Sequence, residues 1–271
     1  MVAKVAVVEV PQWRGSGAVT AERLKEGARL LAGLVGGDQR VRVEVDDDLA
    51  ATAAKVRAAV EGVSGELIVT VGGDCGVELA PVAAARKRYG DRLVVVWFDA
   101  HGDLNTPDSS PSGAYHGMVL RALTGEGPAG LVADEPLDAG QIVLAGVRDL
   151  DPHEASFVEG HGIRQLPPVV DPRALVEAIE ACGGEHRATA DDSVVYLHID
   201  FDVLDPRFFE SVGCPTPGGL VADELISLVK AVGERFKVVG IGLMEYEPGR
   251  AEDQELMSVM VAGIMEGCGR G

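Results

Sequence analysis

Runs of aliphatic residues alternate along this chain with alanine-rich stretches of helical character, and this alternation restricts the folds that the chain can adopt. The run at 93–98, for example, reads LVVVWF. Strands buried on both faces of a parallel sheet have this continuous apolar character, and helices between them cover the sheet. The pattern predicts strands at 4–10, 41–45, 66–71, 93–98, 141–145, 163–166, 193–199 and 237–243, and helices at 20–35, 49–61, 76–89, 115–124, 173–182 and 221–233.

These elements predict an α/β protein with three layers, in which helices cover both faces of a parallel sheet. Neither an internal repeat nor a linker rich in Pro and Ser divides the 271 residues, so we expect a single domain over 1–271. Hydrophobic residues make up 46% of the chain, which suffices for a large core. Aromatic residues make up only 4%, so aliphatic side chains must fill that core.

The chain is strongly acidic, because 43 Asp and Glu residues against 24 Lys and Arg residues give a formal charge of −19. Such a charge argues against nucleic acid or an anionic membrane as a partner and favours cationic ligands. The first apolar run ends at Glu9 and Pro11, too early for a signal peptide or a membrane span. The cysteines are Cys75, Cys182, Cys214 and Cys268. Their spacing fits neither a disulfide framework nor a zinc site, so we expect a cytoplasmic protein.

Potential metal ligands follow two of the predicted strands. Asp99, His101 and Asp103 alternate at the end of the run at 93–98, and Asp200 and Asp202 alternate a hundred residues later. In an extended chain, residues two apart point to the same side, so the side chains of each set converge. Carboxylates and an imidazole in this number exceed what one hard cation usually takes from a protein. They suggest two metal ions that activate water.

Further polar residues follow other predicted strands. Cys75 follows the strand at 66–71 through Gly-Gly-Asp, and Glu245 follows the strand at 237–243. Ligands of open parallel sheets bind at the carboxyl ends of the strands. We therefore expect these residues and the acidic pairs to meet at one site.

Four segments of the chain resemble the motifs of the arginase or ureohydrolase superfamily. They are GGDC at 72–75, DAHGD at 99–103, DFDVLDP at 200–206 and MEYEP at 244–248, against GGDH, DAHxD, DxD followed by DP, and MExxP in the family. The resemblance covers most of the chain. It implies a three-layer α/β/α sandwich around an eight-stranded parallel sheet. It also implies two Mn²⁺ ions bridged by a hydroxide, which attacks the carbon of a guanidinium or amidine group.

The resemblance further implies roles for individual residues. The metal ligands would be Cys75, Asp99, His101, Asp103, Asp200 and Asp202. His116 matches a histidine that shuttles protons, and Glu245 matches a carboxylate that pairs with the guanidinium. Two sets of residues would bind the other end of an amino-acid substrate, one its α-carboxylate and the other its α-amino group. Positions that bind an α-carboxylate are matched by Asn105, Ser110 and Ser112, and those that bind an α-amino group by Asp149, Asp151 and Glu154.

Several positions depart from the family pattern. Cys75 stands where the family has a histidine. In the pocket, Cys214 replaces a threonine and Ala114 replaces an asparagine, and Gly242 replaces an aspartate that stands behind the glutamate matched by Glu245. A coordinated cysteine is a thiolate, which adds negative charge and lets zinc or cobalt compete with manganese. Alternatively, Cys75 is a buried residue that binds no metal. With a cysteine ligand at this position, the chain resembles the branch of the family that serves D-cycloserine biosynthesis. That branch hydrolyses Nω-hydroxy-L-arginine to hydroxyurea and L-ornithine.

The leading hypothesis is therefore an amidinohydrolase of antibiotic biosynthesis whose substrate is Nω-hydroxy-L-arginine, a small guanidino amino acid. Ordinary arginase and formimidoylglutamate hydrolysis are the alternatives among enzymes. A different class is a metal-poor pseudoenzyme that serves in binding or regulation. His198 alternates with Asp200 and could face the site, although a buried structural histidine is at least equally compatible with the sequence. The sequence indicates no oligomeric state.

Overall fold

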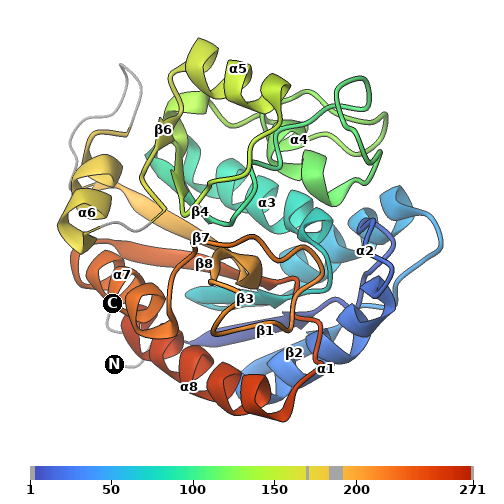
Figure 1. Cartoon of the computed structure of the whole chain (residues 1–271). Coiled ribbons are helices and arrows are strands. Elements are labelled where there is room, and N and C mark those ends of the chain that lie inside the picture. The colour runs from blue at the N-terminus through green and yellow to red at the C-terminus, as the bar shows by residue number, and fades with distance from the viewer. Residues whose placement is uncertain (1–3, 169–170, 183–191, 270–271) are drawn as a thin grey trace.

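The computed structural model of the chain describes residues 4–168, 171–182 and 192–269. Eight strands form one sheet in the order β2-β1-β3-β8-β7-β4-β5-β6, and every neighbouring pair is parallel (Figure 1). The strands are β1 (Val5–Glu9), β2 (Gln39–Arg42), β3 (Leu67–Val71), β4 (Leu93–Phe98), β5 (Ile142–Ala145), β6 (Arg164–Gln165), β7 (Val194–Asp200) and β8 (Lys237–Met244). The predicted strands all occur, most of them with ends shifted by one or two residues.

Helices cover both faces of the sheet (Figure 1). They are α1 (Leu24–Leu34), α2 (Leu49–Gly62), α3 (Leu79–Tyr89), α4 (Val119–Leu123), α5 (Pro152–His161), α6 (Pro172–Glu180), α7 (Ala222–Arg235) and α8 (Ala251–Cys268). One hydrophobic core contains residues of α1, α6, α7 and α8, and the other contains residues of α2 to α5. The predicted three-layer α/β/α sandwich with an eight-stranded parallel sheet is confirmed.

Strand β4 shows why the apolar runs are continuous. Val94, Val96 and Phe98 belong to the core under α1 and α6 to α8, whereas Leu93, Val95 and Trp97, the residues between them, belong to the opposite core. None of these six side chains is exposed to solvent. A polar residue anywhere on this strand would be buried without water, so the strand has no hydrophilic face.

The sequence analysis did not predict α5 or α8. Helix α5 follows Asp151, whose backbone N–H donates to the Glu154 carboxylate at 2.8 Å, as in a capping box. Helix α8 buries apolar residues at helical spacing, among them Met257, Met260, Val261 and Ile264. Within the described part of the chain, no helix combines the length and apolar character that crossing a membrane requires.

The strand order places the chemically interesting residues next to one another. Strands β3, β8, β7 and β4 are consecutive neighbours in the sheet. Their carboxyl ends lead directly to Cys75, Glu245, Asp200 and Asp99. Since all strands run in parallel, these four residues lie along the same edge of the sheet.

Gly73, between β3 and Cys75, allows two loops of this edge to approach closely. A Cβ atom at position 73 would lie 1.4 Å from the carbonyl oxygen of Gln12. We expect Gly73→Ala to lower the free energy of unfolding by about 3 kcal/mol, because the backbone must move. The matched change Gly33→Ala, in α1 with no atom within 4 Å of the new Cβ, should stabilise by about 0.5–1 kcal/mol. Urea unfolding measures both, and equal effects would contradict the close approach.

Candidate metal centre and substrate cavity

A cavity of about 360 Å³ opens at the carboxyl edge of the sheet. All of the site residues expected from the sequence line it, except Cys75 and Asp99, which are buried immediately beneath. The lining includes His101, Asp103, Asn105, Ser110, Ser112, His116, Asp149, Asp151, Glu154, Asp200, Asp202, Cys214 and Glu245. The structure thus brings together residues that are up to 170 positions apart in the chain.

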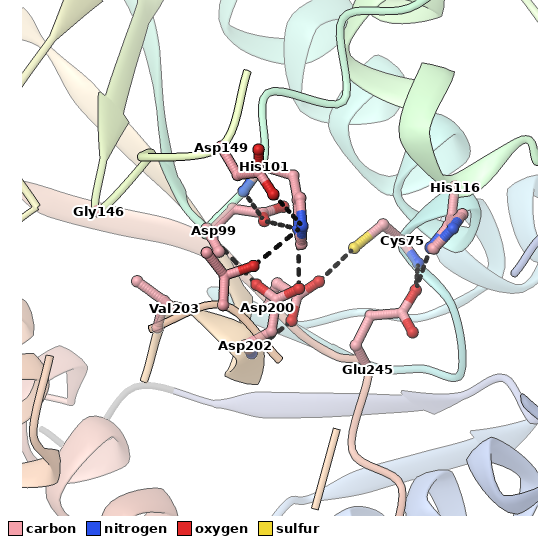
Figure 2. Close-up of polar contacts among 12 residues, drawn as sticks. Cys75, Asp99, His101, His116, Gly146, Asp149, Asp200, Asp202, Val203 and Glu245 are labelled. Carbon is pink, nitrogen blue, oxygen red and sulfur yellow. Dashed lines mark hydrogen bonds and ion pairs between the residues drawn. The ribbon is translucent and has the colours of Figure 1, made fainter. Parts of the chain in front are cut away.

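Hydrogen bonds fix the acidic residues at the ends of β4 and β7 (Figure 2). The indole N–H of Trp97 donates to Asp99 Oδ2 at 3.1 Å. The carboxylate of Asp200 accepts the backbone N–H of Asp202 at 2.6 Å, which closes the turn after β7. Asp202 in turn accepts the backbone N–H of Ala100 at 3.0 Å. These contacts join the two strand ends and orient the three carboxylates.

Possible ligand atoms gather in overlapping groups, within each of which all atoms lie within 4.8 Å of one another. Their members are Asp99, His101 and Asp202; Cys75, Asp99, Asp103 and His198; and Cys75, Asp200 and Glu245. In the first group, His101 Nδ1 lies 2.9 Å from Asp202 Oδ2. Cys75 Sγ, in the other two, lies 3.2 Å from Asp200 Oδ2 (Figure 2). All six predicted metal ligands belong to these groups.

The carboxylates of the site repel one another in a buried environment. Burial and neighbouring carboxylates raise the pKa values of Asp103 and Asp200 well above the ordinary value, and that of Asp202 to about 6. Burial also raises the pKa of Asp99, but hydrogen bonds with His101 and His198 outweigh it, so the net shift is downward. Burial and nearby acidic groups raise the pKa of the Cys75 thiol. Positive charge placed among these groups would favour their ionised forms.

The residues present fit divalent metal ions. Asp103 Oδ2 is buried and has no hydrogen-bond partner among the described residues. Its backbone has a φ of 51°, in the left-handed region that a residue with a side chain rarely adopts. Carboxylates with an imidazole suit manganese and similar ions, and the thiol of Cys75 adds a soft donor. A cation bound by Asp103 would give this buried carboxylate oxygen a partner and would account for the strained backbone.

His116 and Glu245 form an ion pair beside this cluster. The carboxylate of Glu245 lies 3.0 Å from His116 Nδ1 and accepts the backbone N–H of Cys75 at 3.0 Å (Figure 2). Glu245 also has a left-handed backbone, with a φ of 60°. Burial lowers the pKa of His116, but the charge of Glu245 and the hydrogen bond with it raise the pKa to about 9. The imidazole therefore carries a proton at neutral pH next to the site.

One wall of the cavity carries hydroxyl groups and an amide. Ser110 Oγ and Ser112 Oγ lie 3.4 Å apart, and each accepts a backbone N–H of the same loop. The amide of Asn105 donates to Asp151 Oδ2 at 2.8 Å and accepts from the hydroxyl of Ser109. The hydroxyl protons of Ser110 and Ser112 can serve as donors toward an anionic group.

The acidic loop before α5 also lines the cavity. The side chain of Asp149 is 66% exposed, and its carboxylate lies 4.0 Å from His101 Nε2. Glu154 is buried, and its two oxygens accept the backbone N–H groups of Leu104 and Asp151, each at 2.8 Å. Glu154 therefore holds the loop in place, and Asp149 is the accessible carboxylate. Cys214 also lines the cavity, and burial, followed by the charge of Glu245, raises the pKa of its thiol to about 11.

Two residues of the site were not assigned by sequence reasoning. His198 is fully buried with its Nε2 3.5 Å from Cys75 Sγ, and its alternation with Asp200 was the available signal. Arg148 donates to the carbonyl oxygens of Gly146 at 2.9 Å, Asp202 at 2.9 Å and Thr216 at 2.6 Å. It ties the loops after β5 and β7 to each other. Nothing in the local sequence distinguishes this arginine from a surface one.

The fold and the ligand cluster define an α/β protein with a metal centre at the carboxyl edge of its sheet. The sequence profile of the Arginase family matches residues 22–268, so the chain belongs to the arginase family. This family depends on a binuclear metal centre, and the cluster described above supplies the corresponding donors.

Individual relatives agree with this assignment. The chain is similar to the arginase of Staphylococcus aureus strain MRSA252, with 37% identity over 183 residues, which are 66% of this chain and 60% of that protein. It is 32% identical to the arginase of Neurospora crassa over 204 residues, 71% of this chain and 56% of that one. The matches span less than two thirds of these relatives. The solved arginase of Entamoeba histolytica in complex with L-ornithine shares the fold, with a TM-score of 0.84, 24% identity and 99% and 98% of the two chains covered.

The ion pair of His116 with Glu245 predicts a pH-dependent stability. Its histidine pKa is raised to about 9, so the stabilisation is complete below the ordinary value of about 6.5 and is lost as the pH rises through 9. We expect His116→Gln to lower the unfolding free energy of the metal-free protein by on the order of 2 kcal/mol at about pH 6, and by much less at about pH 10. Urea unfolding at both pH values tests this, with the exposed His153→Gln as control. A penalty independent of pH contradicts the pairing.

Proposed function

We propose that this protein is a binuclear metal amidinohydrolase that hydrolyses a guanidino amino acid, with Nω-hydroxy-L-arginine as the leading substrate. The observation that carries the proposal is the position of Glu245. Its carboxylate lies within one ligand-atom group with Cys75 and Asp200 and also lines the open cavity. A planar guanidinium cation bound to the Glu245 carboxylate would lie directly beside the residues that can bind metal.

The reaction needs help because a guanidinium carbon is a poor electrophile, with its charge spread over three nitrogens. Metal ions held by Cys75, Asp99, His101, Asp103, Asp200 and Asp202 would supply Lewis acidity that lowers the pKa of a water from about 15.7 toward about 7. Glu245 orients the planar substrate by charge-assisted hydrogen bonds. Its oxygen that now contacts His116 Nδ1 at 3.0 Å is then shared with the substrate.

His116 handles the proton of the departing group. Breaking the C–N bond to the ornithine side chain leaves an amine that must gain a proton. The protonated imidazole of His116 lines the cavity and can donate one. A water proton restores the imidazolium, so protons and charge balance over the cycle.

The amino-acid end of the substrate has complementary groups on the cavity walls. The hydroxyl groups of Ser110 and Ser112 and the amide of Asn105 suit an α-carboxylate, and the carboxylates of Asp149 and Asp151 suit an α-ammonium group. Glu154 contributes by holding the acidic loop, because its oxygens already accept backbone N–H groups. These groups favour an amino acid over a simple guanidine that lacks a carboxylate.

Cys75 and Cys214 favour the hydroxylated substrate over L-arginine. A thiolate at position 75 adds negative charge, so its metal is a weaker Lewis acid than one bound by a neutral histidine. An N-hydroxyguanidine is less basic than a guanidine and is more readily neutral, so it needs less electrophilic help. Of the departures from the family pattern, Cys214 lines the cavity and leaves room for an N-hydroxyl group. The space beside Gly242 is filled by the Glu78 carboxylate instead.

Other parts of the sequence analysis remain predictions. They are manganese as the native metal, a role in antibiotic biosynthesis, a cytoplasmic location, one catalytic domain over residues 1–271, and the absence of nucleic-acid and membrane partners. The oligomeric state stays open. Hydrolysis of L-arginine or formimidoylglutamate and a metal-poor binding protein are the competing functions.

A product assay on the metal-loaded protein tests the proposal. We expect hydroxyurea and L-ornithine in equal amounts from Nω-hydroxy-L-arginine, at a kcat/KM about tenfold or more above that for L-arginine, or about 1.4 kcal/mol in barrier. Glu245→Gln should lower this rate by about 100-fold, because it removes the charged partner of the substrate. Equal turnover of both substrates, or formamide release from formimidoylglutamate, would favour the other hydrolases. No turnover with less than two ions per chain would favour the binding protein.

Replacing the thiol of Cys75 tests the basis of this specificity. We expect Cys75→His to retain both metal ions and to shift the ratio of kcat/KM values toward L-arginine by on the order of tenfold, because a neutral ligand makes the metal a stronger Lewis acid. Cys268→Ala, at the end of α8, serves as a control for the loss of a buried thiol. An unchanged ratio with retained metal would show that Cys75 does not set the preference.

A further inference from the structure

His198 lies in the middle of the sheet beneath the cavity. It stands on β7 two residues before Asp200, so the two side chains leave the strand on the same face. In the sheet it is paired with Trp97 of β4 on one side and Gly242 of β8 on the other. Its ring stacks on Trp97 with centroids 3.5 Å apart and an interplanar angle of 14°. The orientation of the buried imidazole is therefore fixed.

The side of the imidazole turned away from the cluster has an acidic partner. His198 Nδ1 lies 3.4 Å from Glu78 Oε2, and the other oxygen of Glu78 accepts the hydroxyl of Tyr196 at 3.0 Å. Glu78 is fully buried. A Cβ atom at Gly242 would lie 2.2 Å from Glu78 Oε2, so the glycine provides the space for this carboxylate. A proton held on Nδ1 by Glu78 leaves the Nε2 lone pair available.

The other nitrogen of the ring faces possible metal ligands. His198 Nε2 lies 3.5 Å from Cys75 Sγ and 3.8 Å from Asp99 Oδ2, and these residues form one ligand-atom group with Asp103. A metal about 2.3 Å from a sulfur and about 2.0 Å from a nitrogen, at a tetrahedral angle, separates the two atoms by about 3.5 Å. The observed spacing of sulfur and nitrogen matches this value.

We propose that His198 is a metal ligand. Cys75, after β3, stands where the family has a histidine, and His198 provides an imidazole to the same metal position from β7. The ion bound there has Cys75, His198, Asp99 and Asp103 as donors, and Glu78 is a positioning residue that fixes the imidazole through Nδ1. The inference rests on the proposed metal hydrolase. A thiolate together with an imidazole binds Zn²⁺ or Co²⁺ more strongly than Mn²⁺, so the two positions of the centre differ in metal preference.

Titration of the metal-free full chain with Co²⁺ tests this ligand set. We expect a near-ultraviolet charge-transfer band from the thiolate and visible bands of a four- or five-coordinate ion. His198→Gln should shift the visible bands and weaken one of the two ions about tenfold or more, while the charge-transfer band from Cys75 persists. Glu78→Gln should weaken the same ion without removing a ligand. The control His161→Gln, whose Nδ1 lies 3.0 Å from the Phe157 carbonyl oxygen at the end of α5, should leave the spectrum unchanged.

A second measurement avoids any change at the buried position 198. In a His101→Ala background, X-ray absorption of the protein with one equivalent of Zn²⁺ should show one sulfur near about 2.3 Å together with imidazole scattering. Sulfur without imidazole scattering, or a His198→Gln variant with the full spectrum and affinity of the unchanged protein, would overturn the proposal.

Failure of this inference and failure of the proposed function give different results. If the spectra assign His198 as a ligand and none of the guanidino substrates is hydrolysed, the metal site stands and the proposed function fails. If hydroxyurea is formed and the spectra do not respond to His198→Gln, the proposed function stands and His198 is a structural residue.

Discussion

Mutual repulsion among buried carboxylates is the constraint on which this structure depends. Asp99, Asp103, Asp200 and Asp202 are each at most 4% exposed and lie at two adjacent strand ends. Because these side chains are almost fully buried, the water of the cavity disperses little of their charge. His101 supplies part of the balancing charge, since Asp202 and Asp99 raise its pKa strongly despite its burial. Divalent cations bound to the cluster would take over this role, because His101 must give up its extra proton to act as a ligand.

The backbone around the cluster holds its side chains in place before anything binds. Asp103 and Glu245 have left-handed φ values of 51° and 60°, a conformation that costs of order 1–3 kcal/mol at each residue and persists only where the surroundings enforce it. Glu245 is held by its N–H, which donates to the Gly73 carbonyl oxygen at 2.8 Å. Arg148 secures the carbonyl groups of the neighbouring loops. The folding energy of the sheet thus maintains the arrangement of the donors.

The sequence was most informative where one physical requirement decided the structure. Strand β4 needs an apolar residue at every position, and its predicted bounds, 93–98, agree with the structure. Edge strand β2 has alternating exposed residues, and its predicted range, 41–45, overlaps the observed Gln39–Arg42 only in part. Helix α8 was not predicted, although its methionines and aliphatic residues recur at helical spacing, because no side-chain cap marks its start after Arg250. Helix α5 was missed because Asp151 and Glu154 were interpreted only as substrate groups.

For the site, the sequence indicated which residues lie at strand ends but not what each one contacts. The ligand groups combine residues from two or three segments, and their distances depend on the register of β3, β4, β7 and β8. The partners of His198 show this clearly. Glu78 and Gly242 are remote from it in sequence, and only the pairing of β7 with β8 reveals that the glycine makes room for the carboxylate. Roles that depend on such cross-strand neighbours require coordinates.

Asp99 belongs to two of the ligand-atom groups, with His101 and Asp202 on one side and with Cys75 and His198 on the other. Its Oδ1 lies 3.4 Å from His101 Nδ1 and its Oδ2 lies 3.8 Å from His198 Nε2. A single carboxylate that serves two neighbouring cations couples their occupancies, because whichever ion arrives first sets the charge and orientation that the second one meets. By reciprocity, each ion alters the affinity of the other by the same factor. If ions occupy both groups as proposed, loading of this centre is a cooperative equilibrium whose two binding constants cannot be assigned independently.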